Sequence, residues 1–161
     1  MLIEIVAAIF TLILFTFLGY SFHWMFHQRW SGRFYTAHYN HHHIQYPINN
    51  FSSDSYRYSG KDSTVWLFGL CFAPIIAGMI AITVLHVVSL FLGLSILVEM
   101  AFIGWLNNSL HDNFHLTKSF WQRFWFFDKL VSRHKQHHIN TNTNLGIFSF
   151  VWDKILGTFK E

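Results

Sequence analysis

The sequence predicts an all-α integral membrane protein, a helical bundle of about three to four membrane helices with a histidine-rich helical cap on the cytosolic side. Of the 161 residues, 52% are hydrophobic and only 12% are charged, whereas soluble domains carry roughly 25% charged residues. Two apolar runs are long enough to cross a bilayer. Twelve histidines are present, most of them in spaced clusters. Because a chain of this length has room for one domain, we expect a single membrane-bound domain over residues 1–161.

The first membrane helix is predicted over residues 2–22. From Leu2 to Phe22 the chain is apolar apart from Glu4, and about 20 such residues span a hydrocarbon core. A secretory signal peptide would show a basic n-region, a shorter apolar stretch and a small-residue cleavage site. None of these is present, so we expect a retained transmembrane helix.

A second apolar block runs from Val65 to about Leu106. A single helix of about forty residues is too long for a bilayer, whereas two helices joined by a tight turn fit it. We therefore expect spans over residues 65–85 and 87–107, with the tip of the hairpin near His86 to Ser89.

The basic residues indicate the orientation of these spans. Three crossings leave the N-terminus and the hairpin tip on one side, with residues 29–62 and the chain after about Asn107 on the other. All eleven Lys and Arg residues fall on that second side. The positive-inside rule makes this side cytosolic, so we expect a multi-pass membrane protein whose cap faces the cytosol.

The remaining segments are polar or aromatic. Residues 45–64, with Pro47 and a serine cluster, are predicted to form a loop. Residues 120–130 combine aromatic and basic side chains, which suits a helix in the headgroup region or rings that pack the cap. Residues 146–159 form a second aromatic segment, too short to span a membrane.

Composition excludes two classes of protein. The net charge of +3 is small, and the basic residues form no stripe that would bind nucleic acid. The single cysteine, Cys71, lies in an apolar run and supports neither a disulfide framework nor a thiolate metal site. Any metal must therefore be held by nitrogen and oxygen.

The histidines recur in two motifs, HxxxH followed by HxxHH, and this pair occurs once on each side of the hairpin. The motif histidines are His23, His27, His38, His41, His42, His111, His115, His134, His137 and His138. Residues three or four apart share a helix face, so each HxxxH directs two imidazoles at one point and each HxxHH directs three. We expect all four clusters to emerge at the cytosolic face.

Ten gathered imidazoles predict two divalent cations, held by about five nitrogens each. Imidazole suits iron, zinc, copper and nickel. We expect His43 to face away from the other histidines of its cluster, and His86 to lie at the far membrane edge. Neither is counted as a ligand.

Two residues near His111 are the candidate catalytic residues. Asp112 is its neighbour in sequence, and Asn107 lies one turn earlier on the same helix face, within reach of an imidazole or a bound water. Glu99 lies about 18 Å along the helix from His111, too far to bind the metals, and we favour a structural role for it. Weaker candidates for holding a ligand are Asn108, Asp128 and Asp153.

The order of the motifs resembles that of the fatty acid hydroxylase/sterol desaturase superfamily of membrane di-iron enzymes. The tail is also similar to that family's closing N-x-G…W-D…G-T-F stretch, through Asn144, Gly146, Trp152, Asp153 and residues 157–159. The resemblance covers about residues 20–160. It implies a four-helix membrane core and a cytosolic cap in which the ten motif histidines hold two irons.

The implied activity is that of an oxygen-dependent oxidoreductase that hydroxylates or desaturates a C–H bond of a membrane lipid, such as a fatty acyl chain or a sterol. Two iron ions are the implied cofactor, with zinc possible in purified protein, and O2 is the co-substrate. The chain shows no fused haem domain, so we expect an external electron donor, a reductase with a ferredoxin or cytochrome-type carrier.

Two alternatives remain. A carotenoid hydroxylase of the same superfamily is equally short, but its first and third clusters usually have one more residue between the histidines. A non-catalytic metal-binding or metal-transport membrane protein is also rich in histidine. A transporter would carry its polar ligands at the bilayer midplane, whereas these clusters lie outside the predicted spans.

Overall fold

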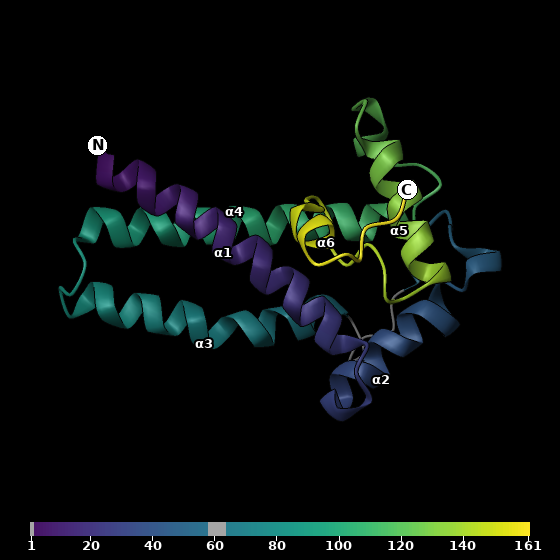
Figure 1. Cartoon of the computed structure of the whole chain (residues 1–161), viewed down its shortest axis with the longest axis horizontal. Helices are drawn as coiled ribbons and strands as arrows, with labels where there is room; N and C mark the ends of the chain where they lie inside the picture. Colours follow the sequence, from purple (N-terminus) through teal and green to yellow (C-terminus); the bar gives the residue numbers. More distant parts are fainter. Residues whose placement is uncertain (1, 58–63) are drawn as a thin grey trace.

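The computed structural model of the chain describes residues 2–57 and 64–161 and is built from helices. The long helices α3 (Thr64–Val84) and α4 (Leu90–Phe114) lie along its longest axis, and the long helix α1 (Leu2–Phe26) runs obliquely across them (Figure 1). No strand occurs within the described ranges, where an isolated bridge pairs Ser53 with Leu116. The predicted all-α fold class is confirmed.

The second apolar block forms the predicted hairpin, with its turn at residues 85–89 between α3 and α4. Ser89 caps α4, because its hydroxyl accepts a hydrogen bond from the Leu92 amide at 3.2 Å. A Cβ added at Gly93 would collide with the side chain of Thr83. The two helices are therefore in direct contact near the turn, and only a glycine permits this approach.

Two of the described helices are long and apolar enough to cross a membrane, Ile5–Phe26 and Leu90–Phe114, and Phe68–Val84 is a shorter apolar helix. Large apolar side chains cover the outer surfaces of the long helices, and Phe91 and Val98, for example, are each 69% exposed. Such a surface is unfavourable in water and suits a lipid environment. The number of crossings and the cytosolic orientation stay predictions.

Two of the long helices continue beyond the predicted spans. α1 ends at Phe26 rather than at residue 22, and α4 ends at Phe114 rather than near residue 107. The added turns contain His23 and His111, and both imidazoles are buried. Because these polar side chains point inward, the helices continue without interruption, and a long helix carries the first histidine of each HxxxH.

A cap of short helices covers one end of the long helices (Figure 1). It comprises η1 (Arg29–Ser31), α2 (Arg33–Asn40), the π-helical turn η2 (His41–Gln45), η3 (Ile48–Asn50), η5 (Phe120–Arg123), α5 (Phe127–Ile139) and α6 (Val151–Ile155). The loop predicted over residues 45–64 contains η3, and its residues 58–63 lie outside the described residues.

Residues 120–130, for which a headgroup helix and rings packing the cap were both open, do not form one continuous helix. The segment divides into the short turn η5 and the first turn of α5, with residues 124–126 between them. Its two parts are held by different contacts. The Trp121 indole donates a hydrogen bond to Ser109 of α4 at 3.0 Å, and Phe127 is buried in the core, whereas Trp125 is 84% exposed.

The C-terminal segment returns to the long helices and packs against α1. Trp152 of α6 donates a hydrogen bond to the Thr16 hydroxyl at 3.1 Å, and the Tyr20 and Thr158 hydroxyls lie 3.2 Å apart. A hydrophobic cluster joins α4, α5 and this segment through Leu110, Phe114, Phe127, Leu130, Ile147 and Phe150. The end of the chain is therefore an integral part of the packed cap.

Candidate metal centre

The motif histidines come together at the capped end of the long helices. Nine of the ten form two groups, in each of which the donor nitrogens lie within 4.8 Å of one another. The first group is His23, His27, His38, His42 and His137, and the second group is His41, His115, His134 and His138.

His111, the tenth motif histidine, lies beside the second group. Its ring centroid is 4.8 Å from that of His41 and 4.7 Å from that of His134. Its Nε2 is buried and has no hydrogen-bond partner among the described residues. A buried unpaired nitrogen needs a partner, so His111 is the fifth donor available to the second group. His43 and His86 are exposed and belong to neither group.

Each HxxHH motif divides its imidazoles between the two groups. In the first HxxHH motif, His38 and His42 belong to the first group and His41 belongs to the second group. In the other HxxHH motif, on α5, His137 belongs to the first group, whereas His134 and His138 belong to the second group. The expectation that all three nitrogens of a motif meet at one point is wrong. At about 100° per residue, residue i+4 lies about 40° to one side of residue i, and residue i+3 lies about 60° to the other side.

This exchange interlocks the two halves of the chain. Each group contains one or both histidines of an HxxxH motif and the first and last histidines of the HxxHH motif on the same side of the hairpin. Each group also contains the middle histidine of the HxxHH motif from the other side of the hairpin, which is His137 in the first group and His41 in the second. With His111 included, each group offers five nitrogens, which matches the predicted number for each ion.

Contacts between Nε2 atoms have the lengths expected around a metal ion. In the first group, His38 Nε2 lies 2.9 Å from that of His23 and 3.0 Å from that of His27. An ion with bonds of about 2.1 Å holds ligands at right angles about 3.0 Å apart and tetrahedral ligands about 3.4 Å apart. The observed separations are closer to those of ligands at right angles than to those of tetrahedral ligands.

The second group shows why a cation fits these residues. His115 donates its Nδ1–H to the Phe51 carbonyl at 2.9 Å, and His138 donates its own to the Tyr46 carbonyl at 2.9 Å, so each has a lone pair on Nε2. These two Nε2 atoms lie 3.1 and 3.2 Å from His134 Nε2. One N–H on His134 satisfies one of them, whereas a cation binds all three.

Burial holds the imidazoles in the neutral form. It lowers the pKa of His27 to about 2, helped by repulsion from neighbouring imidazoles, and lowers the pKa of His138 to about 3 although the bond to Tyr46 opposes this. Burial also lowers the pKa well below 6.5 for His38, His41, His42, His115, His134 and His137. Neutral imidazole is the form that binds metal.

Backbone carbonyls orient two ligands of the first group. His23 donates its Nδ1–H to the Leu145 carbonyl at 2.6 Å, and His137 donates its own to the Thr143 carbonyl at 2.7 Å. Such bonds fix the tautomer and the ring direction, leaving Nε2 for the metal. The short segment that follows α5 therefore orients two imidazoles of the first group, one from α1 and one from α5.

Asp153 holds this segment in place. Its carboxylate is fully buried and accepts hydrogen bonds from the amides of Leu145 at 2.7 Å and Gly146 at 2.8 Å, and from the Thr158 hydroxyl at 2.8 Å. Leu145, whose amide donates to Asp153, is also the residue whose carbonyl orients His23. Asp153 therefore acts on the metal centre through the backbone.

Asn144 completes the support. It adopts a left-handed conformation, with φ of 51°, which asparagine tolerates better than most residues. Its side-chain amide donates to the carbonyls of Arg133 at 3.2 Å and Lys160 at 2.9 Å, and its carbonyl oxygen accepts from the Lys160 amide at 2.9 Å. The Asn and Asp of the closing N-x-G…W-D…G-T-F stretch therefore hold the backbone that orients the imidazoles of the first group.

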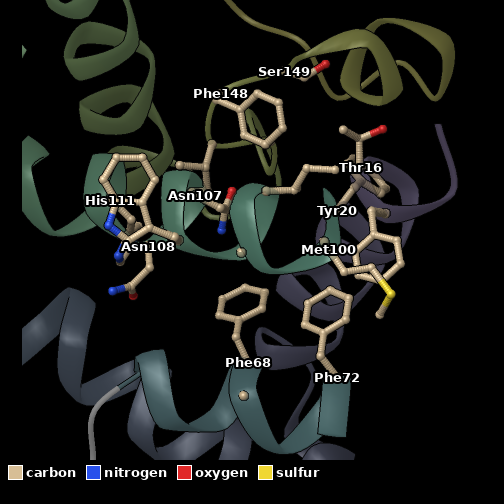
Figure 2. Close-up of a pocket in the computed structure, with 18 of the residues that line it drawn as sticks. Thr16, Tyr20, Phe68, Phe72, Met100, Asn107, Asn108, His111, Phe148 and Ser149 are labelled. Carbon is tan, nitrogen blue, oxygen red and sulfur yellow. The ribbon is translucent and has the colours of Figure 1, made fainter. Parts of the chain in front are cut away.

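The predicted supporting residues occupy different positions. Asp112 Oδ1 lies 4.0 Å from His111 Nδ1, beyond hydrogen-bonding distance, and Asn108 donates to the Asp112 carboxylate at 3.4 Å. Asn107 lines a cavity together with His111 (Figure 2). Asp128 is exposed in the first turn of α5. The catalytic roles of Asp112 and Asn107 stay predictions.

Other supporting groups were missed by sequence reasoning. The carbonyls that orient imidazoles belong to Tyr46, Phe51, Thr143 and Leu145. A carbonyl is common to every residue, so residue type gives no signal for it. For residues 144–146 the sequence did contain a signal, namely Asn144 and Asp153 of the closing stretch, whose side chains hold that backbone.

The cavity of about 350 Å³ lies between α1, α3, α4 and residues 145–149. Apolar side chains such as Phe68, Phe72 and Phe148 form most of its wall, and His111 is the one motif histidine in the wall as far as the structure describes it (Figure 2). Small-molecule sites typically measure about 300–1,000 Å³. The sequence did not predict this cavity, and Glu99 lies outside both it and the two groups.

The exchange of middle histidines makes a testable prediction. Replacing either His41 or His137 by Ala removes one nitrogen from the group that is built mainly by the other half of the chain. Loss of a residue that merely supports a ligand costs about 10–100-fold in metal affinity, and we expect loss of a ligand to cost no less. Metal titration of the purified variants measures this. His43→Ala is the control, and full affinity in both test variants would contradict the assignment.

A second prediction concerns Asp153. Asp153→Asn replaces one acceptor oxygen by an NH2 group that cannot accept a hydrogen bond from a backbone amide. We expect a loss of about 10–100-fold in metal affinity with helix content retained, measured by metal titration and circular dichroism. Asp128→Asn, at an exposed carboxylate, should leave the affinity unchanged. Equal affinities for the two variants would exclude a role for Asp153 at the metal centre.

The comparisons with known proteins agree with this geometry. A family model described as fatty acid hydroxylase matches residues 8–158, a range that contains all four histidine motifs, the hairpin and most of the closing stretch. No curated protein and no solved structure matched the chain. Since the family match extends over nearly the whole sequence, the chain belongs to the fatty acid hydroxylase family, within the fatty acid hydroxylase/sterol desaturase superfamily.

Proposed function

We propose that the protein is an oxygen-dependent, di-iron oxidoreductase that hydroxylates or desaturates a C–H bond of a membrane lipid. The observation that carries this proposal is the apolar cavity between the long helices, which ends at His111 beside the second histidine group. Family membership supports the same activity.

The donor set favours a pair of iron ions over a structural zinc. Structural zinc sites are almost always four-coordinate and usually contain cysteine, whereas each group here offers five neutral nitrogens once His111 is counted. Imidazole suits iron. When bound, two reduced iron ions supply the oxygen-activating chemistry that attack on an unactivated C–H bond requires.

The chain's own residues provide access and exclude water. Gly69 of α3 and Ala101, Gly104 and Trp105 of α4 line the cavity and are also exposed, which indicates an opening between these two helices. Their outer surfaces are apolar, so a lipid can enter sideways from a bilayer. The aromatic wall inside the cavity then keeps water from the reacting carbon.

Hydroxylation and desaturation differ in the fate of oxygen. Hydroxylation places one oxygen atom of O2 in the product and reduces the other to water, whereas desaturation reduces both atoms to water. Either reaction requires electrons from outside the chain, and we propose a separate reductase with a ferredoxin or cytochrome-type carrier as the donor.

This function predicts lipid-dependent oxygen uptake. The protein is purified anaerobically with Fe(II), its bound metal is quantified, and oxygen uptake is followed with a reductant and extracted lipids. We expect two irons per chain and a product that is heavier by one oxygen or lighter by two hydrogens. His134→Ala should lower the rate at least about tenfold, and His86→Ala should not. Tight zinc binding without oxygen chemistry after iron loading would leave a metal-binding membrane protein.

A further inference from the structure

A single loop orients two imidazoles of the second group. The Tyr46 carbonyl accepts the Nδ1–H of His138, and the Phe51 carbonyl accepts that of His115. The rings of the two loop residues pack the other way round. The Tyr46 ring stacks on that of His115 with centroids 4.0 Å apart, and the Phe51 ring lies 5.0 Å from that of His138. The direction of both imidazoles therefore depends on how firmly residues 46–51 are held.

Little regular structure holds this loop. It contains the three-residue turn η3, where the Asn50 amide donates to the Pro47 carbonyl at 2.7 Å. Beyond the turn, the Ser53 amide donates to the His115 carbonyl at 2.9 Å. A segment with few backbone hydrogen bonds opens more readily than a helix. A side chain that ties the parts of the loop together therefore fixes the two orienting carbonyls.

Arg57 supplies these ties. Its Nη1 donates to the Gln45 carbonyl at 2.7 Å and to the Asn50 carbonyl at 2.9 Å. Its Nη2 donates to the side-chain oxygen of Asn50 at 2.6 Å. Gln45 immediately precedes Tyr46, and Asn50 immediately precedes Phe51. One guanidinium thus binds the peptide carbonyl next to each of the two orienting residues.

Arg57 also holds the side chain of Tyr46. Its backbone amide donates to the Tyr46 hydroxyl at 2.8 Å, and its guanidinium carbon lies 5.5 Å from the centroid of the Tyr46 ring. Tyr46 is buried, whereas Arg57 is half-buried. The ring that stacks on His115 is therefore fixed at its hydroxyl end as well as through its backbone.

This arrangement parallels the support of the first group. There the Asp153 carboxylate accepts a hydrogen bond from the amide of Leu145, whose carbonyl orients His23. In both places a charged side chain binds the backbone at or next to a residue that orients an imidazole. The two supports share no residue, since one lies in residues 45–57 and the other in residues 143–158. Each histidine group therefore has a support of its own.

We propose that Arg57 is the positioning residue of the second group, because its guanidinium holds the backbone whose carbonyls direct His115 and His138. The inference rests on the proposed function, since both assume a metal ion in each group. A guanidinium has five N–H donors in one plane, whereas a lysine has a single nitrogen. The three acceptor oxygens of Gln45 and Asn50 therefore require arginine, and loss of Arg57 should weaken the binding of one ion only.

Metal titration tests this without turnover. The full chain in detergent is titrated with Co(II), which follows Fe(II) in the order of affinities, and the dissociation constants of both ions are measured. We expect Arg57→Gln to weaken one ion by about 10–100-fold, as for other residues that support a ligand. Arg57→Lys, which keeps the charge, should retain most of this loss. Arg123→Gln is the matched control and should change neither constant, since the Arg123 guanidinium lies over the exposed Phe120 ring.

Two further backgrounds identify the ion that is affected. His38→Ala removes a donor from the first group and His134→Ala removes one from the second, so each leaves one ion tightly bound. Adding Arg57→Gln should weaken the remaining ion at least about tenfold in the His38→Ala background. In the His134→Ala background its effect should stay within about twofold. A first-group ion that stays tightly bound also shows that the cap of the Arg57 variant is folded.

Equal weakening of both ions, or no weakening of either, would overturn the proposal, as would full affinity in Arg57→Lys. These outcomes leave the proposed function standing, because that function is judged by oxygen uptake and by its product. Cobalt binding as expected in a protein that consumes no oxygen would reject the oxygenase function alone.

Discussion

The structure depends on keeping ten neutral imidazoles, nine of them buried and His27 half-buried, around two points. An unsatisfied buried polar group costs about 1–3 kcal/mol, and His111 Nε2 is buried without a partner in the described chain. A metal ion converts such a cost into bonding, as the three facing Nε2 atoms of the second group illustrate. Because the groups exchange their middle histidines, separating the two halves of the chain would remove ligands from both. The two histidine groups are in this sense the core of the cap.

Ligand orientation and cavity shape depend on the same short segment. The carbonyls of Thr143 and Leu145 orient imidazoles of the first group, and residues 145–149 form part of the cavity wall. Asn144 and Asp153 hold this backbone through side-chain hydrogen bonds. A shift of the segment would therefore change both the direction of two imidazoles and the shape of the cavity.

The hairpin and the clustering histidines could be predicted from the sequence, whereas the division of each HxxHH motif, the role of Asp153 and the cavity could not. Hydropathy and length located the hairpin turn, and the helical repeat identified the histidines that come together, because both signals are local. The division of each HxxHH between two groups depends on how α2 and α5 face each other, and this is a tertiary property. Asp153 ranked low for the same reason, since its effect passes through the Leu145 backbone, which no side-chain pattern reveals. The cavity was invisible because the absence of side chains at Gly19, Gly69 and Gly104 carries meaning only once three helices are placed together.

The position of His111 links these features. It lies on a helix that is apolar enough to cross a membrane, it contacts the second group, and it lines the cavity. Placing it further along α4 would move it into the cap, away from any lipid between the helices. Placing it nearer the hairpin would put it on the apolar stretch, more than a helical turn from the cap residues that complete its group. The end of a long helix therefore allows a single imidazole to belong both to a buried histidine group and to the wall of the apolar cavity, and the continuation of α4 past its predicted boundary supplies this position.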